Sequence, residues 1–137
     1  MNLLISLVET ASRVLGDEFC HEIMEIHHKM KKDAPSGTAL TLGDALAATR
    51  GFKADNFITA REGMVGERPC DRVGIMALRG GDVVGEHTVY FLGSGERIEL
   101  THRASDRSIF ARGAWRAANW VVGRPAGLYS MADVLGI

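Results

Sequence analysis

The segment from residue 25 to residue 39 concentrates side chains that can bind an anion and move a proton. It holds two adjacent imidazoles, at His27 and His28, followed by lysines at positions 29, 31 and 32. Histidine exchanges protons near neutral pH, and a lysine ammonium group neutralises carboxylates. Gly37 and Thr38 open an expected helix, whose first backbone N–H groups have no acceptor within the helix. The segment therefore predicts a site for a small polyanion that takes up a proton.

Each of these residues also has an ordinary interpretation when it is taken alone. Two adjacent histidines on a strand point to opposite faces and can be packing residues, and a lysine-rich loop can simply be solvated. The combination favours a ligand, because a dicarboxylate needs several donors that converge without competing anions. Lys31, the Thr38 hydroxyl and an imidazole supply such donors, while Gly37 lets a ligand approach the backbone closely. We therefore interpret the segment as a dicarboxylate site.

Periodicity along the chain predicts the helices that position this segment. Apolar residues at helical spacing predict helices over residues 3–15, 38–49 and 106–122, with a short capped helix at 130–135. The helix at 106–122 is expected to turn an apolar stripe inward, made of Ile109, Phe110, Ala114, Ala117 and Val121. Because the chain opens almost directly on its first helix, we expect it to be a piece of a longer protein.

Alternating apolar residues and glycine-rich turns predict strands over residues 18–28, 56–61, 73–79, 83–92 and 97–103. Gly80-Gly81-Asp82 predicts a tight hairpin between the third and the fourth of these strands. The first strand alternates imperfectly, so either both of its faces are covered or its boundaries differ. The order of elements predicts an α+β fold, a mixed and largely antiparallel open sheet of about four to five strands with helices on one face.

Composition and charge exclude several classes of protein. The chain has 137 residues, which suits one domain with a single core, and its net charge of −1 argues against a nucleic-acid surface. No apolar run reaches about 18 residues, so no membrane span is expected. The two cysteines, Cys20 and Cys70, match no metal or redox spacing. We therefore expect a reduced, cytoplasmic setting.

No metal and no locally bound dinucleotide are expected. The five histidines show no paired ligand spacing on a helix, and the lysines beside His28 would repel a cation. The sequence contains no G-x-S-x-G elbow, phosphate-binding loop or G-x-G-x-x-G fingerprint. A zinc-binding hydrolase fragment stays as an alternative, which metal analysis of the purified protein would test.

The same segment resembles the dihydrodipicolinate reductase family. The matching residues are Glu25-Ile26-His27-His28, Lys31 and Asp33-Ala34-Pro35-Ser36-Gly37-Thr38-Ala39. Further matches are Arg61-Glu62-Gly63, Gly66-Glu67-Arg68, Gly85-Glu86-His87-Thr88, the run from Gly95 to His102, and Arg107 with Phe110-Ala111 and Gly113-Ala114. The resemblance covers nearly the whole of this chain and the carboxy-terminal part of the family's protein.

The resemblance implies a two-domain reductase of which residues 1–137 form one domain, for substrate binding and tetramerisation. An amino-terminal Rossmann domain, absent from this chain, would carry NADPH or NADH, and the helical tail at residues 104–137 would pack towards it. The family reduces 4-hydroxy-tetrahydrodipicolinate, a cyclic dicarboxylate, to tetrahydrodipicolinate in diaminopimelate and lysine biosynthesis. Its members are usually homotetramers joined through the sheets. Without a nucleotide domain we expect no significant reductase activity from this chain.

The resemblance also implies roles for individual residues. His27 matches the family's acid/base histidine and Lys31 its proton-donating lysine. The positions that bind the substrate's carboxylates correspond to His28, Gly37 and Thr38. A looser match places Arg107 and Phe110 on the side of the nucleotide cofactor. The alternative is a non-catalytic oligomerisation or dicarboxylate-binding module of the same fold, which would form a stable tetramer.

Overall fold

The structure is a computed structural model, and it describes residues 1–52 and 57–137. The helices are α1 (Asn2–Leu15), α2 (Gly37–Arg50), α3 (Ser108–Val121) and α4 (Met131–Leu135), with one short 3₁₀ turn, η1 (Gly16–Glu18). The strands are β1 (Cys20–His27), β2 (Phe57–Ile58), β3 (Val73–Arg79), β4 (Gly85–Leu92) and β5 (Arg97–Ala104). The sequence predicted each of these helices and strands to within a few residues, except that β2 is much shorter. Residue 56, at the start of the predicted strand 56–61, lies outside the described residues.

The five strands form one open sheet in the order β2-β3-β1-β4-β5. β1 pairs in parallel with β3 and antiparallel with β4, β2 pairs in parallel with β3, and β4 and β5 form an antiparallel hairpin. The predicted α+β fold with a mixed open sheet is therefore confirmed, with its pairings divided evenly between the two directions. β1 lies at the centre of the sheet, with two strands on the β3 side and two on the β4 side.

The hairpin predicted at Gly80-Gly81-Asp82 is wrong. β3 and β4 do run in opposite directions, but β1 lies between them, so they share no hydrogen bonds. The turn instead passes over the end of β1, where Gly80 N donates to His27 O at 3.0 Å and Lys29 N donates to Gly81 O at 3.2 Å. A turn signal shows that the chain reverses, and it carries no information about a strand inserted between the two arms.

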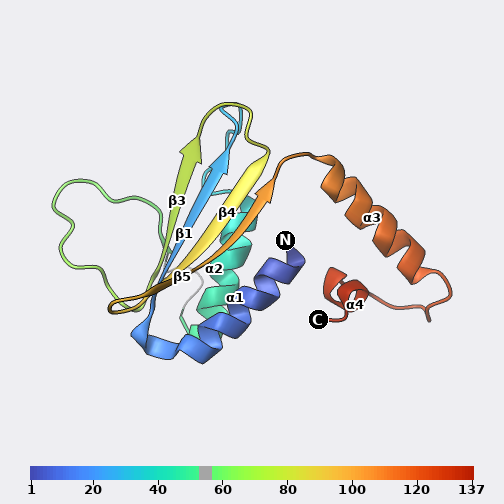
Figure 1. The fold of residues 1–137 in the computed structure, drawn as a ribbon, viewed down its shortest axis with the longest axis horizontal. Coiled ribbons are helices and arrows are strands. Elements are labelled where there is room, and N and C mark those ends of the chain that lie inside the picture. Colours follow the sequence, from blue (N-terminus) through green and yellow to red (C-terminus); the bar gives the residue numbers. More distant parts are fainter. Residues whose placement is uncertain (53–56) are drawn as a thin grey trace.

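α1 and α2 cover one face of the sheet, and the core lies between them (Figure 1). The fully buried side chains there include Val8 of α1, Leu42 and Leu46 of α2, and Ile75 and Phe91 of the sheet. α2 approaches closely at Gly43, because a Cβ at that position would lie 2.9 Å from Ile75 Cδ1. This close contact fixes α2, and therefore its first turn, against the central strands.

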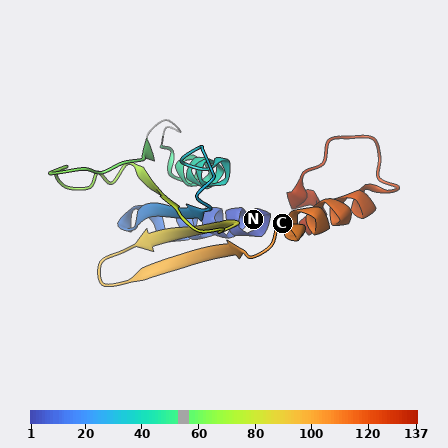
Figure 2. The same ribbon diagram turned by 90° about the horizontal axis from the view of Figure 1, so that it is seen from above.

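The carboxy-terminal helices extend away from the sheet (Figure 2). The predicted inward stripe of α3 is wrong for this chain, because none of its residues is buried, and Phe110 and Trp115 are 58% and 72% exposed. α4 carries the expected capping box between Ser130 and Asp133. An amphipathic stripe shows which face a helix can bury, but not whether this part of the chain supplies the partner. Within the described residues, no helix is both long and apolar enough to cross a membrane.

Candidate active site

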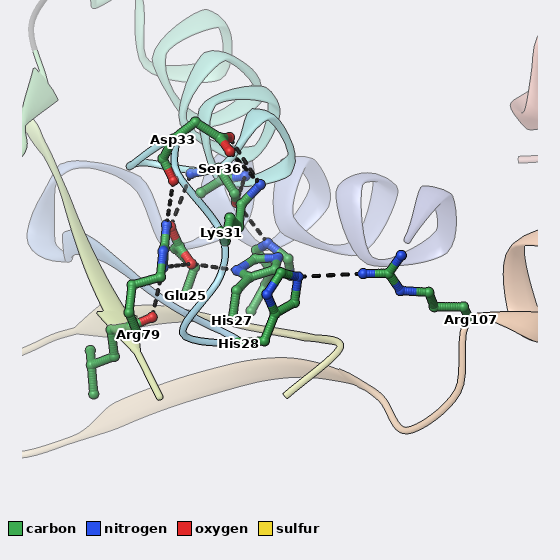
Figure 3. A network of polar contacts seen from close by, with 11 residues as sticks. Glu25, His27, His28, Lys31, Asp33, Ser36, Arg79 and Arg107 are labelled. Carbon is green, nitrogen blue, oxygen red and sulfur yellow. Dashed lines mark hydrogen bonds and ion pairs between the residues drawn. The ribbon is translucent and has the colours of Figure 1, made fainter. Parts of the chain in front are cut away.

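The candidate site lies at the carboxyl end of β1, where two polar side chains face the helix layer. Side chains alternate along a strand, so Glu25 and His27 share the face that carries Ile23 and His21. All four are buried, which explains the imperfect apolar alternation of this strand. Glu25 is 0% exposed, and its Oε2 lies 2.6 Å from Nδ1 of His27 (Figure 3).

The Glu25 carboxylate is the centre of this cluster. Arg79, at the end of the neighbouring β3, donates to both of its oxygens at 2.7 Å, and the Ser36 backbone N–H donates to Oε1 at 2.9 Å. Burial by itself raises the pKa of Glu25. The hydrogen bonds from Arg79, His27 and Ser36 outweigh this effect and lower the pKa below its usual range. Glu25 is therefore an ionised carboxylate with every neighbour donating to it. Its hydrogen bonds with Arg79 in turn raise the pKa of that guanidinium group.

A second imidazole packs against the first. His87 on β4 and His27 lie edge to face, with ring centroids 5.1 Å apart. Nε2 of His87 lies 3.0 Å from the Ser36 hydroxyl, and its Nδ1 has no partner among the described residues. Burial, followed by repulsion from His27, lowers the pKa of His87 to about 4. His87 is therefore neutral at physiological pH.

The start of α2 meets the end of β1 at Ser36. The Ser36 hydroxyl caps α2 by accepting from the Ala39 N–H at 3.2 Å, and its backbone N–H binds Glu25. Helix geometry leaves the N–H groups of Gly37 and Thr38 without intrahelical acceptors. Gly37 is exposed, and a Cβ there would meet nothing within 4 Å. This turn of α2 can therefore receive an anion on its open side.

Lys31 belongs to the loop between His28 and the cap of α2. Its ammonium group lies 2.9 Å from both carboxylate oxygens of Asp33, and its own N–H donates to His28 O at 3.1 Å. Arg79 also donates to the Asp33 carbonyl at 2.7 Å, which ties this loop to β3. The Lys31 side chain is only 20% exposed, whereas that of Asp33 is 62% exposed. In Figure 3 the lysine lies between Asp33 and the two labelled histidines.

Arg107 approaches the site from the segment that precedes α3. Its guanidinium group lies 3.4 Å from Nε2 of His28, although 79 residues separate the two in sequence (Figure 3). Phe110, one turn further on, lines a different hollow of about 440 Å³ formed by α1, α3 and α4. Of the two residues expected on the cofactor side, Arg107 therefore lies at the histidine pair and Phe110 does not.

The structure brings most of the predicted site residues to one end of the sheet. His27, His28 and Lys31 follow one another from β1, and Gly37 and Thr38 open the helix that Ser36 and Glu25 join to that strand. Sequence reasoning missed the parts played by Glu25, Arg79 and His87. One signal was present, because a glutamate two residues before a histidine on a strand shares its face. Arg79 and His87 come from other strands and needed the sheet order.

The candidate site is not arranged for a metal ion. Among residues 1–52 and 57–137, no group of three or more His, Cys, Asp or Glu side chains is placed to hold one. The anionic group nearest to His27 is Glu25, whose two oxygens are already engaged by Arg79, Ser36 and His27 itself. The donors that remain open are therefore suited to an anion.

Comparison with known proteins identifies the family of this chain. The family model for "Dihydrodipicolinate reductase, C-terminus" matches residues 1–135. The 4-hydroxy-tetrahydrodipicolinate reductases of Anaeromyxobacter sp. (strain Fw109-5) and Myxococcus xanthus (strain DK1622) are 59% and 58% identical. These matches cover 100% and 99% of this chain but 52% and 50% of the relatives.

A solved structure has the same fold. The chain is similar to a dipicolinate-bound dihydrodipicolinate reductase from Paenisporosarcina sp. TG-14, with a TM-score of 0.68 and 24% identity, over 96% of this chain and 51% of that one. The chain thus spans about half the length of the relatives that it matches. The match over residues 1–135 and the identity to curated relatives together show that the chain belongs to the dihydrodipicolinate reductase family, as its carboxy-terminal domain.

Proposed function

We propose that this chain is the substrate-binding and catalytic domain of a reductase that converts 4-hydroxy-tetrahydrodipicolinate to tetrahydrodipicolinate in diaminopimelate and lysine biosynthesis. One observation carries the proposal most directly. The Ser36 amide binds the same carboxylate that holds His27, so the open amides of α2 and the histidine pair belong to one rigid unit. Such a unit offers donors for two carboxylates and a proton carrier beside them.

In this proposal the substrate is a cyclic dicarboxylate. Lys31 neutralises one carboxylate, and the N–H groups and hydroxyl at Gly37 and Thr38 bind the same end of the ring. His28 binds the ring from the opposite side of the loop. On that side Arg107 already contacts the imidazole of His28. Each charge-assisted hydrogen bond contributes roughly 1.5–3 kcal/mol, so several of them together can offset the entropy of binding and give micromolar affinity.

His27 and Lys31 are the proton carriers in the proposed reaction. The 4-hydroxyl group leaves as water, hydride adds to carbon in the conjugated imine that this forms, and a proton adds elsewhere in the ring. An ammonium group beside the bound anion can deliver that proton. His27 is positioned to exchange a proton as general acid and base. The 11% exposure of its side chain limits access by water, which favours transfer to a bound ligand.

The hydride is supplied by NADPH or NADH, held mainly by a separate nucleotide-binding domain. On this chain Arg107 is the residue best placed to meet such a cofactor, because its guanidinium group already lies beside His28. The exposed face of α3, with Phe110, is the surface that we assign to the approaching domain. This domain would then cover α3, which lies within the helical tail at residues 104–137 and has no buried residue here.

We further propose a homotetramer that forms through the uncovered face of the sheet. That face carries an apolar patch in which Met24 pairs with Met76 and Ile26 pairs with Leu78 across β1 and β3. Leu78 is 44% exposed, and an apolar patch on a sheet favours burial by another copy. A cytoplasmic location is proposed as well, in agreement with two unpaired cysteines. A non-catalytic oligomerisation module would share the assembly and bind no dicarboxylate, whereas a non-catalytic dicarboxylate-binding module would bind the ligand but show no turnover even when a nucleotide-binding domain is joined to it.

Titration of the purified chain with pyridine-2,6-dicarboxylate tests the proposal. We expect saturable binding that Lys31→Ala weakens at least tenfold, whereas Lys32→Ala, which removes the neighbouring exposed lysine, changes it little. Absence of binding by the unmodified chain, or equal losses in the two variants, would favour the non-catalytic oligomerisation module. The chain should show no turnover with NADPH until a nucleotide-binding domain is joined to it, and sizing in solution tests the tetramer independently.

A further inference from the structure

Glu25 is a fully buried carboxylate to which the proposed mechanism assigns no role. Its carboxylate contacts three parts of the fold at once, namely His27 on its own strand, Arg79 on β3 and the Ser36 amide at the start of α2. A fully buried carboxylate is costly unless every oxygen is satisfied, and here both oxygens are. An apolar residue at position 25 would give a stable strand without this network of hydrogen bonds. The reason for a carboxylate here therefore lies in the site.

The contact with His27 decides which ring nitrogen carries a proton. An ionised carboxylate can only accept hydrogen bonds, and Oε2 of Glu25 lies 2.6 Å from Nδ1. Nδ1 must therefore carry the proton in this contact, which leaves Nε2 of the neutral ring as its basic nitrogen. A neighbouring carboxylate fixes ring orientation and tautomer in this way in many acid/base and metal-binding histidines.

The opposite nitrogen of the His27 ring faces a position that has no side chain. Nε2 points towards Gly85 on β4, and a Cβ at that position would lie 3.0 Å from it. His87, the other imidazole in contact, is bound to the Ser36 hydroxyl and not to a carboxylate. Of the two packed rings, only His27 thus has a carboxylate bound to a ring nitrogen and fixing its orientation.

We propose that Glu25 is the positioning residue of this site: it holds His27 with the proton on Nδ1, so that Nε2 is the nitrogen that exchanges the substrate's proton, and it fixes the anion-binding turn of α2 beside that histidine. Arg79 keeps the carboxylate in place through two hydrogen bonds. The inference rests on the proposed function only where it names a substrate. The tautomer of His27 and the anchoring of α2 are properties of the chain alone.

Nitrogen-15 NMR of the histidine-labelled chain tests the tautomer, with the signals assigned through single His→Gln variants. We expect the neutral His27 ring to carry its proton on Nδ1. In Glu25→Gln the side-chain NH₂ can donate to Nδ1, so we expect the proton to move to Nε2. The nitrogen-15 chemical shifts of the two ring nitrogens should then be interchanged. Glu22→Gln is the matched control, because Glu22 lies on the same strand, is bound by Arg61 and Arg68, and faces away from His27.

Dicarboxylate binding provides the second measurement. If Glu25 also anchors α2, Glu25→Gln should weaken pyridine-2,6-dicarboxylate binding about tenfold, and Glu22→Gln should not. A proton on Nε2 of His27 in the unmodified chain would overturn the inference, whether or not the Glu25 variant folds. An Nδ1 proton in a chain that binds no dicarboxylate would contradict the proposed function and still support the positioning of His27 by Glu25.

Discussion

The Ser36 hydroxyl lies 3.0 Å from Nε2 of His87 and joins the cap of α2 to strand β4, across 51 residues of sequence. The same hydroxyl accepts from the Ala39 N–H, so one oxygen serves a helix start and a buried imidazole. This contact closes the back of the site, since His87 in turn packs on His27. The rigidity of the anion-binding turn therefore depends on a residue that need not touch the ligand.

Ser36→Ala should destabilise the chain by about 2–4 kcal/mol. It removes the cap of α2, which contributes about 1 kcal/mol, and it leaves a buried ring nitrogen of His87 unpaired, which costs about 1–3 kcal/mol. Urea denaturation followed by circular dichroism measures the change. Ser130→Ala, which removes the exposed cap of α4, is the control and should cost less than half as much. Equal losses would contradict a special role for the buried contact.

Asp33→Asn should tighten dicarboxylate binding by up to about fivefold, on the premise of the proposed function. Asp33 holds the Lys31 ammonium group through two contacts of 2.9 Å and so competes with an anionic ligand. Because this carboxylate is largely exposed, the ion pair is weak and is easily exchanged for a stronger one. Calorimetric titration with pyridine-2,6-dicarboxylate gives the affinity.

The control for this variant is Asp17→Asn, which removes an ion pair with Arg50 at the other end of β1. It should leave the affinity for the dicarboxylate unchanged. Weaker binding by Asp33→Asn would show that the aspartate orients Lys31 and does not compete for it.

Gly74→Ala should release the loop at residues 59–72 from the sheet. A Cβ at Gly74 would collide with Oε2 of Glu22, the carboxylate to which Arg61 and Arg68 of this loop donate. Glu22 would have to move and these ion pairs would break, which we expect to increase amide exchange and proteolysis in the loop. Gly80→Ala is the control, because a Cβ there meets nothing within 4 Å. Unchanged exchange in the Gly74 variant would show that other contacts hold the loop.

Acid should destabilise the fold between pH 6.5 and about pH 4. Burial, assisted by Arg68 at His21 and by His27 at His87, lowers the pKa of both histidines from 6.5 to about 4. Over this range the unfolded chain binds protons at these side chains and the folded chain does not, so a falling pH favours unfolding. The loss reaches at most about 3 kcal/mol for each histidine. Thermal unfolding across this pH range measures it.

His21→Leu should flatten that pH dependence and stabilise the chain at pH 5. His21 is 1% exposed, packs edge-on against Phe91, and neither of its ring nitrogens has a hydrogen-bond partner within the described part of the chain. An apolar side chain of similar size avoids that unsatisfied polar group. His102→Leu is the control, since His102 is less buried and should change the slope less. A slope unchanged in His21→Leu would assign the acid sensitivity to other groups.

The sequence by itself determined the local structure and the chemistry on offer. The apolar period predicted α2 over residues 38–49, and the order of elements predicted an α+β fold. The cluster of His27, His28, Lys31 and Gly37 indicated an anion site before any contact was known. These inferences succeed because period, caps and turns depend on interactions within a few residues of one another.

Only the tertiary structure decided that β1 lies between β3 and β4, and hence that Arg79, 54 residues from Glu25 in sequence, binds that carboxylate. It also decided that α3 is unburied, against the inward stripe that its sequence predicted. Pairing between distant segments depends on which surfaces fill the same space, and that is a property of the whole chain and its partners. The donors of the site could therefore be predicted from the sequence, whereas the bound carboxylate of Glu25 that orients them could not.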